Sequence, residues 1–114
     1  MGLDVGGTTV KGMIVDGNGK IICEENAPTR CGEELADCII DLADTLVRHA
    51  GKTYSALKGI GVCSPGTIDA NGAVVFSGNL KLKNYPLKEL LSKRLSVPVN
   101  VLNDANAAAL GEPR

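Results

Sequence analysis

The first polar segment of this 114-residue chain, Asp4-Val5-Gly6-Gly7-Thr8-Thr9-Val10-Lys11, combines two glycines with two threonines, a carboxylate and a lysine. Glycines between two strands let the backbone approach a ligand with exposed N–H groups, and Thr8, Thr9 and Lys11 add donors for phosphate oxygens. Asp4, at the end of a strand, would be placed to hold a magnesium ion through water. The segment therefore indicates a phosphate-binding turn, with an ordinary glycine hairpin as the alternative. It is not a Walker A loop, because no helix follows the glycines and the G-x-x-x-x-G-K-[S/T] pattern is absent.

A second segment, Cys63-Ser64-Pro65-Gly66-Thr67, ends a buried strand in a Pro-Gly turn. We expect it to present the Gly66 N–H and the hydroxyls of Ser64 and Thr67 at the edge of a sheet, where ligands of open α/β sheets bind. A plain turn is the alternative. Ser64 has no histidine partner, so it is not interpreted as a nucleophile.

Two further segments bring amides and a carboxylate. In Ser77-Gly78-Asn79-Leu80, Asn79 would bond either a ligand hydroxyl or only its own turn. In Asn103-Asp104-Ala105-Asn106, three polar side chains stand where a strand meets an alanine-rich helix. Asp104 is a typical helix cap, but a carboxylate there could also accept a proton from a substrate hydroxyl.

The elements that must position these residues follow from turn signals and apolar spacing. Three strands joined by glycine turns predict an antiparallel meander, and apolar residues at helical spacing predict a helix that Gly51 ends. The expected elements are strands at 2–5, 10–16 and 20–26, a helix at 33–50, a strand at 57–63, an extended piece at 73–76, a helix at 86–95, a strand at 97–102 and a helix at 105–110. This order predicts a single α/β domain over residues 1–114, with a mixed sheet of about five strands and helices on its faces.

Composition restricts the partners that the chain can have. Apolar residues make up 44% of the chain and charged residues 22%, and the formal net charge is −1, which gives no support for binding to nucleic acid or to an anionic membrane. No apolar run is long enough to span a bilayer and no signal-peptide pattern is present, so the cytoplasm is the expected location. Of the four cysteines, none forms a C-x-x-C pair, which favours free thiols over a zinc site.

The segments DVGGTTVKG, GVCSPGTID, FSGNL and PVNVLNDANAAALGE, in this order, resemble the ROK family of bacterial sugar kinases and related repressors. The resemblance implies the actin-like ATPase (ribonuclease H-like) fold, in which two lobes close over ATP and a sugar. It places the phosphate loop, with ATP and Mg²⁺ as cofactors, on Asp4, Gly6, Gly7, Thr8 and Lys11. It places the sugar-binding positions on Gly66, Asn103 and Asp104, with the Gly78-Asn79 loop also near the sugar, and the catalytic base on Asp104.

By the same resemblance, residues 1–114 are expected to be the N-terminal lobe of an ATP-dependent sugar kinase, without the second lobe that holds the adenosine pocket. An isolated lobe is expected to show little or no kinase activity, because it cannot enclose its substrates or exclude water. Its expected partners are ATP, a sugar, and either the missing lobe or a second copy docked on the exposed surface. The alternatives are a non-enzymatic sugar-sensing module, the effector lobe of a repressor, and a fragment with no independent function.

Overall fold

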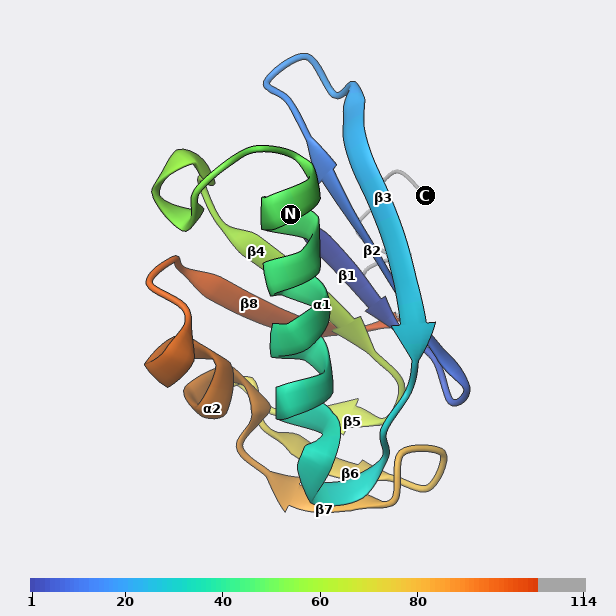
Figure 1. Cartoon of the computed structure of the whole chain (residues 1–114). Helices are drawn as coiled ribbons and strands as arrows, with labels where there is room; N and C mark the ends of the chain where they lie inside the picture. Colours follow the sequence, from blue (N-terminus) through green and yellow to red (C-terminus); the bar gives the residue numbers. More distant parts are fainter. Residues whose placement is uncertain (105–114) are drawn as a thin grey trace.

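The computed structural model describes residues 1–104, which form two sheets and two α-helices (Figure 1). The larger sheet has five strands in the order β3-β2-β1-β4-β8. In that order their bounds are Ile21–Pro28, Thr9–Val15, Gly2–Val5, Ile60–Ser64 and Val99–Asn103. This confirms the predicted α/β class and the mixed sheet of five strands.

The first three strands form the predicted antiparallel meander, in which β1 pairs with β2 and β2 with β3. The other two strands add in parallel, β4 beside β1 and β8 beside β4. Since β1, β4 and β8 run in the same direction, their carboxyl ends meet at one edge of the sheet. This edge, which we call the carboxyl edge, receives three of the four polar segments.

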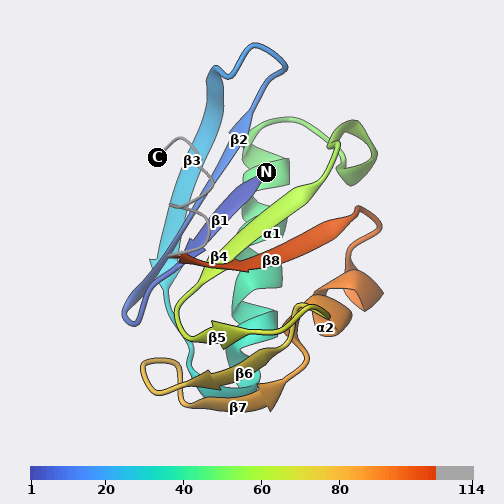
Figure 2. The ribbon, with the colours of Figure 1, turned by 180° about the vertical axis from the view of Figure 1, so that it is seen from behind.

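Both described helices pack on the same side of the larger sheet, as Figures 1 and 2 show from opposite directions. The long helix α1 (Leu35–His49) follows a short 3₁₀ turn η1 (Gly32–Glu34), and the shorter helix is α2 (Leu87–Arg94). A second 3₁₀ turn, η2 (Tyr54–Ala56), precedes β4. The helix predicted at 105–110 lies outside the described residues. We call the other side of the sheet, as formed by residues 1–104, the open face.

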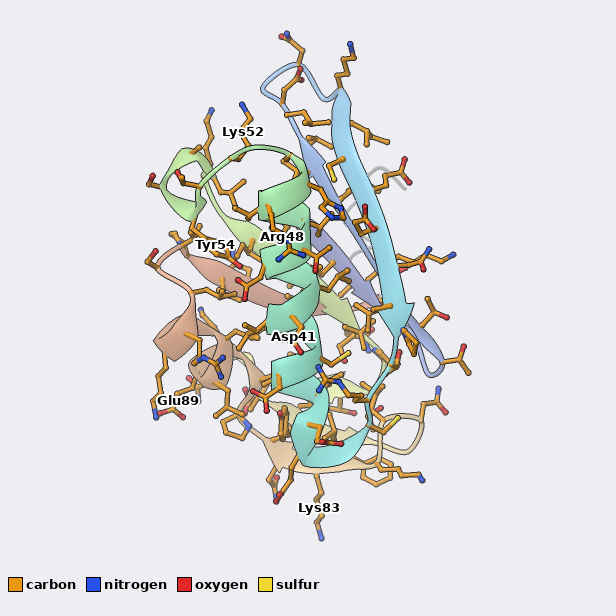
Figure 3. The ribbon with its side chains drawn as sticks, in the orientation of Figure 1. Asp41, Arg48, Lys52, Tyr54, Lys83 and Glu89 are labelled. Atoms are coloured by element: carbon orange, nitrogen blue, oxygen red, sulfur yellow. The ribbon has the colours of Figure 1, made fainter. Side chains whose placement is uncertain are left out.

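Helix α1 forms because its apolar residues recur on one side, and that side faces the sheet. The six residues that predicted it are all buried: Leu35, Cys38, Ile39, Leu42, Leu46 and Val47. Asp41 and Arg48 point away from the sheet toward solvent (Figure 3). Gly51, with φ of +66°, follows the helix as expected for a residue that ends it.

Helix α1 packs directly against Gly12 of β2. A Cβ atom on this glycine would lie 2.6 Å from Leu46 Cδ1 and 2.7 Å from Leu3 Cδ2, closer than side chains approach one another. The absence of a side chain at position 12 therefore sets the distance between α1 and the sheet.

The smaller sheet was only partly predicted. Its three strands, in the order β5-β6-β7, are Thr67–Ile68, Val74–Ser77 and Leu82–Tyr85. The sequence indicated one extended piece at 73–76, which corresponds to β6, and it gave no signal for the two neighbours of that strand. All three strands lie between β4 and β8 in the sequence, below the larger sheet in Figure 2.

Tyr85 joins the smaller sheet to the start of α1. Its hydroxyl accepts the Ala36 N–H at 2.9 Å and donates to the Glu33 carbonyl oxygen at 3.1 Å. Burial is the largest cause that raises the pKa of Tyr85 above its ordinary value, and the nearby Asp37 and Glu33 carboxylates raise it further. The phenol therefore stays neutral and keeps both hydrogen bonds.

None of the helices within residues 1–104 is both long enough and apolar enough to span a membrane.

Candidate functional site

The carboxyl edge of the larger sheet brings most of the predicted site residues to one place. Strand β1 leads into the Gly6-Gly7-Thr8 turn, β4 leads into Pro65-Gly66, and β8 ends at Asn103, next to Asp104. Asp4, Cys63 and Leu102 lie side by side in register on the three strands. Gly6, Pro65 and Asp104 each come one residue past the end of their strand, so the glycine turn, the Pro65-Gly66 turn and Asp104 follow three neighbouring strands at the same edge.

The glycine turn is held by its own backbone and by Thr29. The Gly6 N–H donates to the Thr9 carbonyl oxygen at 2.9 Å, which closes the turn. Thr29, just past the end of β3, donates its hydroxyl to the Gly6 carbonyl oxygen at 2.8 Å and its N–H to the Thr8 carbonyl oxygen at 2.9 Å. Gly7 and Thr8 themselves are exposed. Thr29 therefore fixes the backbone of the turn, while Gly7 and Thr8 remain exposed to solvent.

Asp4 and Lys11 stand beside each other on the open face. They are direct partners in the antiparallel ladder of β1 and β2, and both are exposed, while their neighbours Leu3, Val5 and Val10 are buried under the helices. The carboxylate of Asp4 and the ammonium group of Lys11 thus lie on the two strands that the glycine turn connects, close to that turn. This arrangement suits a phosphate with its counter-cation, because the lysine can meet phosphate oxygens and the carboxylate a hydrated metal ion.

Gly66 marks the crossing from the larger sheet to the smaller one. Its φ of +103° is a conformation that residues with a side chain rarely adopt, and a Cβ atom there would lie 2.3 Å from the Phe76 carbonyl oxygen. Asn103 Nδ2 donates to the Gly66 carbonyl oxygen, so β8 holds this crossing in place. The predicted Pro-Gly turn is present, and it is joined to another predicted site residue.

The expectation for Ser64 was wrong. Its side chain is fully buried, and its hydroxyl donates to the Pro65 carbonyl oxygen at 3.2 Å instead of facing a ligand. The reason is strand alternation: Ser64 has the same orientation as Ile60 and Val62, which face the helices. Thr67, in contrast, is exposed.

The Gly78-Asn79 loop lies against the glycine turn, although 71 positions of sequence separate Asn79 from Thr8. A side-chain carbon on Gly7 would lie 3.9 Å from Asn79 Cβ. Cys31 lies between the two loops, with Sγ 4.0 Å from the Gly7 carbonyl oxygen and 3.7 Å from that of Asn79. Ser77 Oγ accepts the Leu80 N–H at 3.4 Å, so within residues 1–104 this turn is closed without the Asn79 side chain.

Asn103 and Asp104 complete the set. Asn103 is half-buried and Asp104 is exposed, at the end of β8 where the sequence predicted them. The third polar residue of that segment, Asn106, lies outside the described residues. The structure therefore links four predicted positions by direct proximity, from Asn103 through Gly66 and the 77–79 loop to the glycine turn.

Two residues of this region had no signal in the sequence analysis, Thr29 and Cys31. Neither belongs to a recognisable motif, and each acts through a residue at least 23 positions away. The meander offered an indirect signal: because β2 and β3 are antiparallel, the residues that follow β3 return to the edge where β2 begins.

Within residues 1–104, no group of three or more His, Cys, Asp or Glu side chains is arranged to hold a metal ion. None of the four cysteines forms a disulfide, and only Cys38 is fully buried. A hollow of about 590 Å³ lies elsewhere, beside β7, and contains none of the candidate residues. It is lined by Gly32, Glu33, Lys81, Leu82, Lys83, Asn84, Tyr85, Pro86 and Leu90.

Comparison with known proteins gives a consistent result along the whole chain. The model of the ROK family matches residues 1–114. A xylose repressor from Bacillus spizizenii is 33% identical over 98% of this chain and 30% of its own length. A glucokinase from Thermotoga maritima is 39% identical over 98% of this chain and 35% of its own length.

The fold gives the same match. The crystal structure of a ROK family glucokinase from Streptomyces griseus in complex with glucose and AMPPNP aligns with a TM-score of 0.83 and 31% identity, over 96% of this chain and 34% of that one. The chain thus spans about a third of the length of these relatives, and its architecture is that of the actin-like ATPase fold of ROK sugar kinases. Motifs, sequence and fold agree, and the chain belongs to the ROK family.

Proposed function

We propose that residues 1–114 form the N-terminal lobe of an ATP-dependent hexose kinase, in which Asp104 takes the proton from the sugar hydroxyl that attacks the γ-phosphate. The observation that carries this proposal is the meeting of the glycine turn, Gly66, the Gly78-Asn79 loop and the Asn103-Asp104 pair at one edge of the sheet. Relatives of this chain include glucokinases, and one of them was crystallised with glucose and AMPPNP.

The nucleotide side would be formed by Gly6, Gly7, Thr8 and Thr9, with Lys11 and Asp4 beside them. The turn suits a phosphate because its carbonyl oxygens at Gly6 and Thr8, which would repel an anion, are hydrogen-bonded to Thr29. Lys11 would neutralise phosphate charge, and Asp4 would hold Mg²⁺ through water. ATP, when bound, supplies the phosphoryl group that is transferred.

The sugar side would be formed by Gly66, Gly78, Asn79 and Asn103. Amide side chains both donate and accept hydrogen bonds, so they can orient hydroxyl groups. Asp104 is exposed at the end of β8, where its carboxylate can accept a proton as the sugar oxygen becomes a nucleophile. We further propose a cytoplasmic location, where ATP and hexoses meet and free thiols persist.

A chimera tests the proposal without depending on an isolated lobe. This chain would replace the matching 35% of the Thermotoga maritima glucokinase, and phosphorylation of glucose would be followed in a coupled assay. We expect turnover by the chimera and a loss of kcat of about 10²- to 10⁴-fold in Asp104→Asn, with glucose binding retained.

The matched control is Asp37→Asn, which removes an exposed carboxylate that pairs with Arg94 at 3.2 Å and belongs to neither side of the proposed site. Exposed ion pairs contribute little, so its kcat should equal that of the unchanged chimera. A folded chimera without turnover, or an Asp104→Asn variant with full kcat, would contradict the proposal.

A second candidate is the sugar-sensing lobe of a repressor, which the match to a xylose repressor over 98% of the chain favours. Calorimetry with xylose, glucose and other hexoses separates the two candidates. Sugar binding by the chimera without phosphoryl transfer supports the sensing role, and transfer supports the kinase.

A further inference from the structure

Phe76 is an exposed aromatic ring at the sugar side of the proposed site. With 60% of its surface accessible, it is the most exposed large hydrophobic side chain among the described residues. The residues at either end of β6, Val74 and Ser77, are buried, so the strand does not as a whole lie open to solvent. Single exposed apolar side chains are common on protein surfaces, so the position of this ring relative to the candidate site decides what it can do.

The position of Phe76 is defined by two glycines that the sequence analysis assigned to the sugar. Its carbonyl oxygen lies against Gly66, where a Cβ atom would be only 2.3 Å away. Its ring atoms Cε2 and Cζ lie 3.9 and 4.0 Å from the place of a Cβ atom on Gly78. Phe76 therefore lies between the crossing that Asn103 holds and the loop that carries Asn79.

Because Gly78 has no side chain, nothing from position 78 covers the Phe76 ring. Its partner across the ladder, Thr67, is exposed as well and adds a hydroxyl at the same level. An apolar surface with polar groups around it is the arrangement typical of small-molecule sites.

A pyranose ring has hydroxyl groups at its rim and C–H groups on its faces. The amides of Asn79 and Asn103 and the carboxylate of Asp104 suit the rim. Phe76 is the aromatic side chain exposed beside Gly66 and Gly78, and at 60% it is more exposed than Val75 and Leu102, which are each 36% exposed. Val75 points to the other side of the strand, because successive side chains alternate.

We propose that Phe76 packs against the C–H face of the bound sugar and is a specificity-determining residue of this site. The inference rests on the proposed function, because it concerns the sugar of that same site. Phe76 would select sugars whose axial hydroxyl groups do not project toward the ring, since an unpaired hydroxyl buried against an aromatic face loses its hydrogen bonds with water.

Nuclear magnetic resonance of the 114-residue chain tests the contact directly, because Phe76 is its only phenylalanine and its ring signals are unambiguous. Glucose would be titrated into chain labelled at phenylalanine and at backbone amides. We expect the Phe76 ring and the Asn103 amide to shift together, with nuclear Overhauser effects from the ring to the sugar C–H protons. A shift of Asn103 alone, or of neither group, overturns the inference.

Kinetics of the chimera give a second test, in which the proposed function is judged separately. Phe76→Ala should raise the KM for glucose roughly threefold to tenfold, as expected for the loss of one aromatic contact, with the KM for ATP unchanged. Phe76→Trp should retain the low KM, and Val75→Ala is the control for an exposed apolar side chain on the same strand. An active chimera in which Phe76→Ala leaves the KM for glucose unchanged overturns the inference alone, and a folded but inactive chimera overturns the proposed function with it.

Discussion

Thr29 shows how a residue outside every motif can determine the shape of a motif. Its hydroxyl and its N–H engage the carbonyl oxygens of Gly6 and Thr8, the two residues that flank Gly7. A glycine turn left to itself samples many conformations, since glycine restricts the backbone least. The two hydrogen bonds from Thr29 reduce that freedom before any ligand binds.

Thr29→Val removes the hydroxyl and keeps the shape of the side chain and the backbone N–H. One hydrogen bond of about 1 kcal/mol is lost. We therefore expect the KM of the chimera for ATP to rise roughly fivefold, with the KM for glucose unchanged. Thr29→Ser, which keeps the hydroxyl, should behave like the parent; an equal rise in both KM values would show a general loss of folding instead.

For single residues, the sequence predicted the place along the fold better than the side of the sheet that the side chain faces. Asn103, Asp104 and Gly66 lie at the carboxyl edge as predicted, because turn residues and strand ends are local properties of the chain. Ser64 was placed at the correct end of β4 but on the wrong face, since its orientation depends on which side of the sheet the helices cover. Thr29 was missed because its partner lies 23 positions away.

Among the elements, α1 and β2 depend on the gap that Gly12 leaves. Gly12→Ala would place a methyl group 2.6 Å from Leu46 Cδ1 and 2.7 Å from Leu3 Cδ2. We expect a loss of about 1–3 kcal/mol in the free energy of unfolding, measured in urea. Gly61→Ala, on β4, where a Cβ atom would meet nothing within 4 Å, is the control and should change stability little.

The link between β7 and α1 depends on the Tyr85 hydroxyl. Tyr85→Phe leaves the Ala36 N–H without its acceptor at the start of the helix, which should cost about 1–3 kcal/mol in the free energy of unfolding. An unchanged unfolding midpoint in urea would mean that the helix start is held by other contacts.

The same residue predicts a dependence on pH. Because burial raises the pKa of Tyr85, the unfolded chain ionises near pH 10 while the folded chain stays neutral to higher pH. The contribution of Tyr85 to stability is thus complete below about pH 10 and is lost as the pH rises through the raised pKa. Tyr54, whose pKa is raised by burial and by its hydrogen bond to Asp44, titrates in both proteins. The stability difference between parent and Tyr85→Phe should therefore shrink above pH 10.

The smaller sheet shows where prediction from sequence failed for an element. Strand β5 has only two residues, too few for any periodicity. Strand β7 has an irregular backbone, because Asn84 within it has a φ of +50° and Lys81 just before it has a φ of +57°. Neither residue is a glycine, so the sequence did not indicate where this strand begins. The long helix, in contrast, was predicted from its apolar pattern because that pattern extends over four turns.

At the scale of the whole molecule, the part of the chain that the structure describes has exposed apolar side chains on its open face. Val15, Ile22 and Leu102 are 43%, 42% and 36% exposed on strands of the larger sheet. We expect the 114-residue chain to self-associate as its concentration rises, which multi-angle light scattering would detect. The double variant Ile22→Lys/Leu102→Lys should shift the equilibrium toward the monomer, and Val75→Lys, on the smaller sheet, should not. A chain that stays monomeric at all concentrations would contradict this prediction.

The placement of the smaller sheet between β4 and β8 has a consequence for the evolution of specificity. Because β4 and β8 are joined by this one excursion, the residues proposed to surround the sugar, apart from Asn103 and Asp104, occupy a single continuous stretch from Gly66 to Leu80. The proposed nucleotide turn is encoded elsewhere, by residues 4–11 and Thr29. A lineage can thus exchange the first stretch and acquire a new substrate while it inherits the machinery for ATP without change.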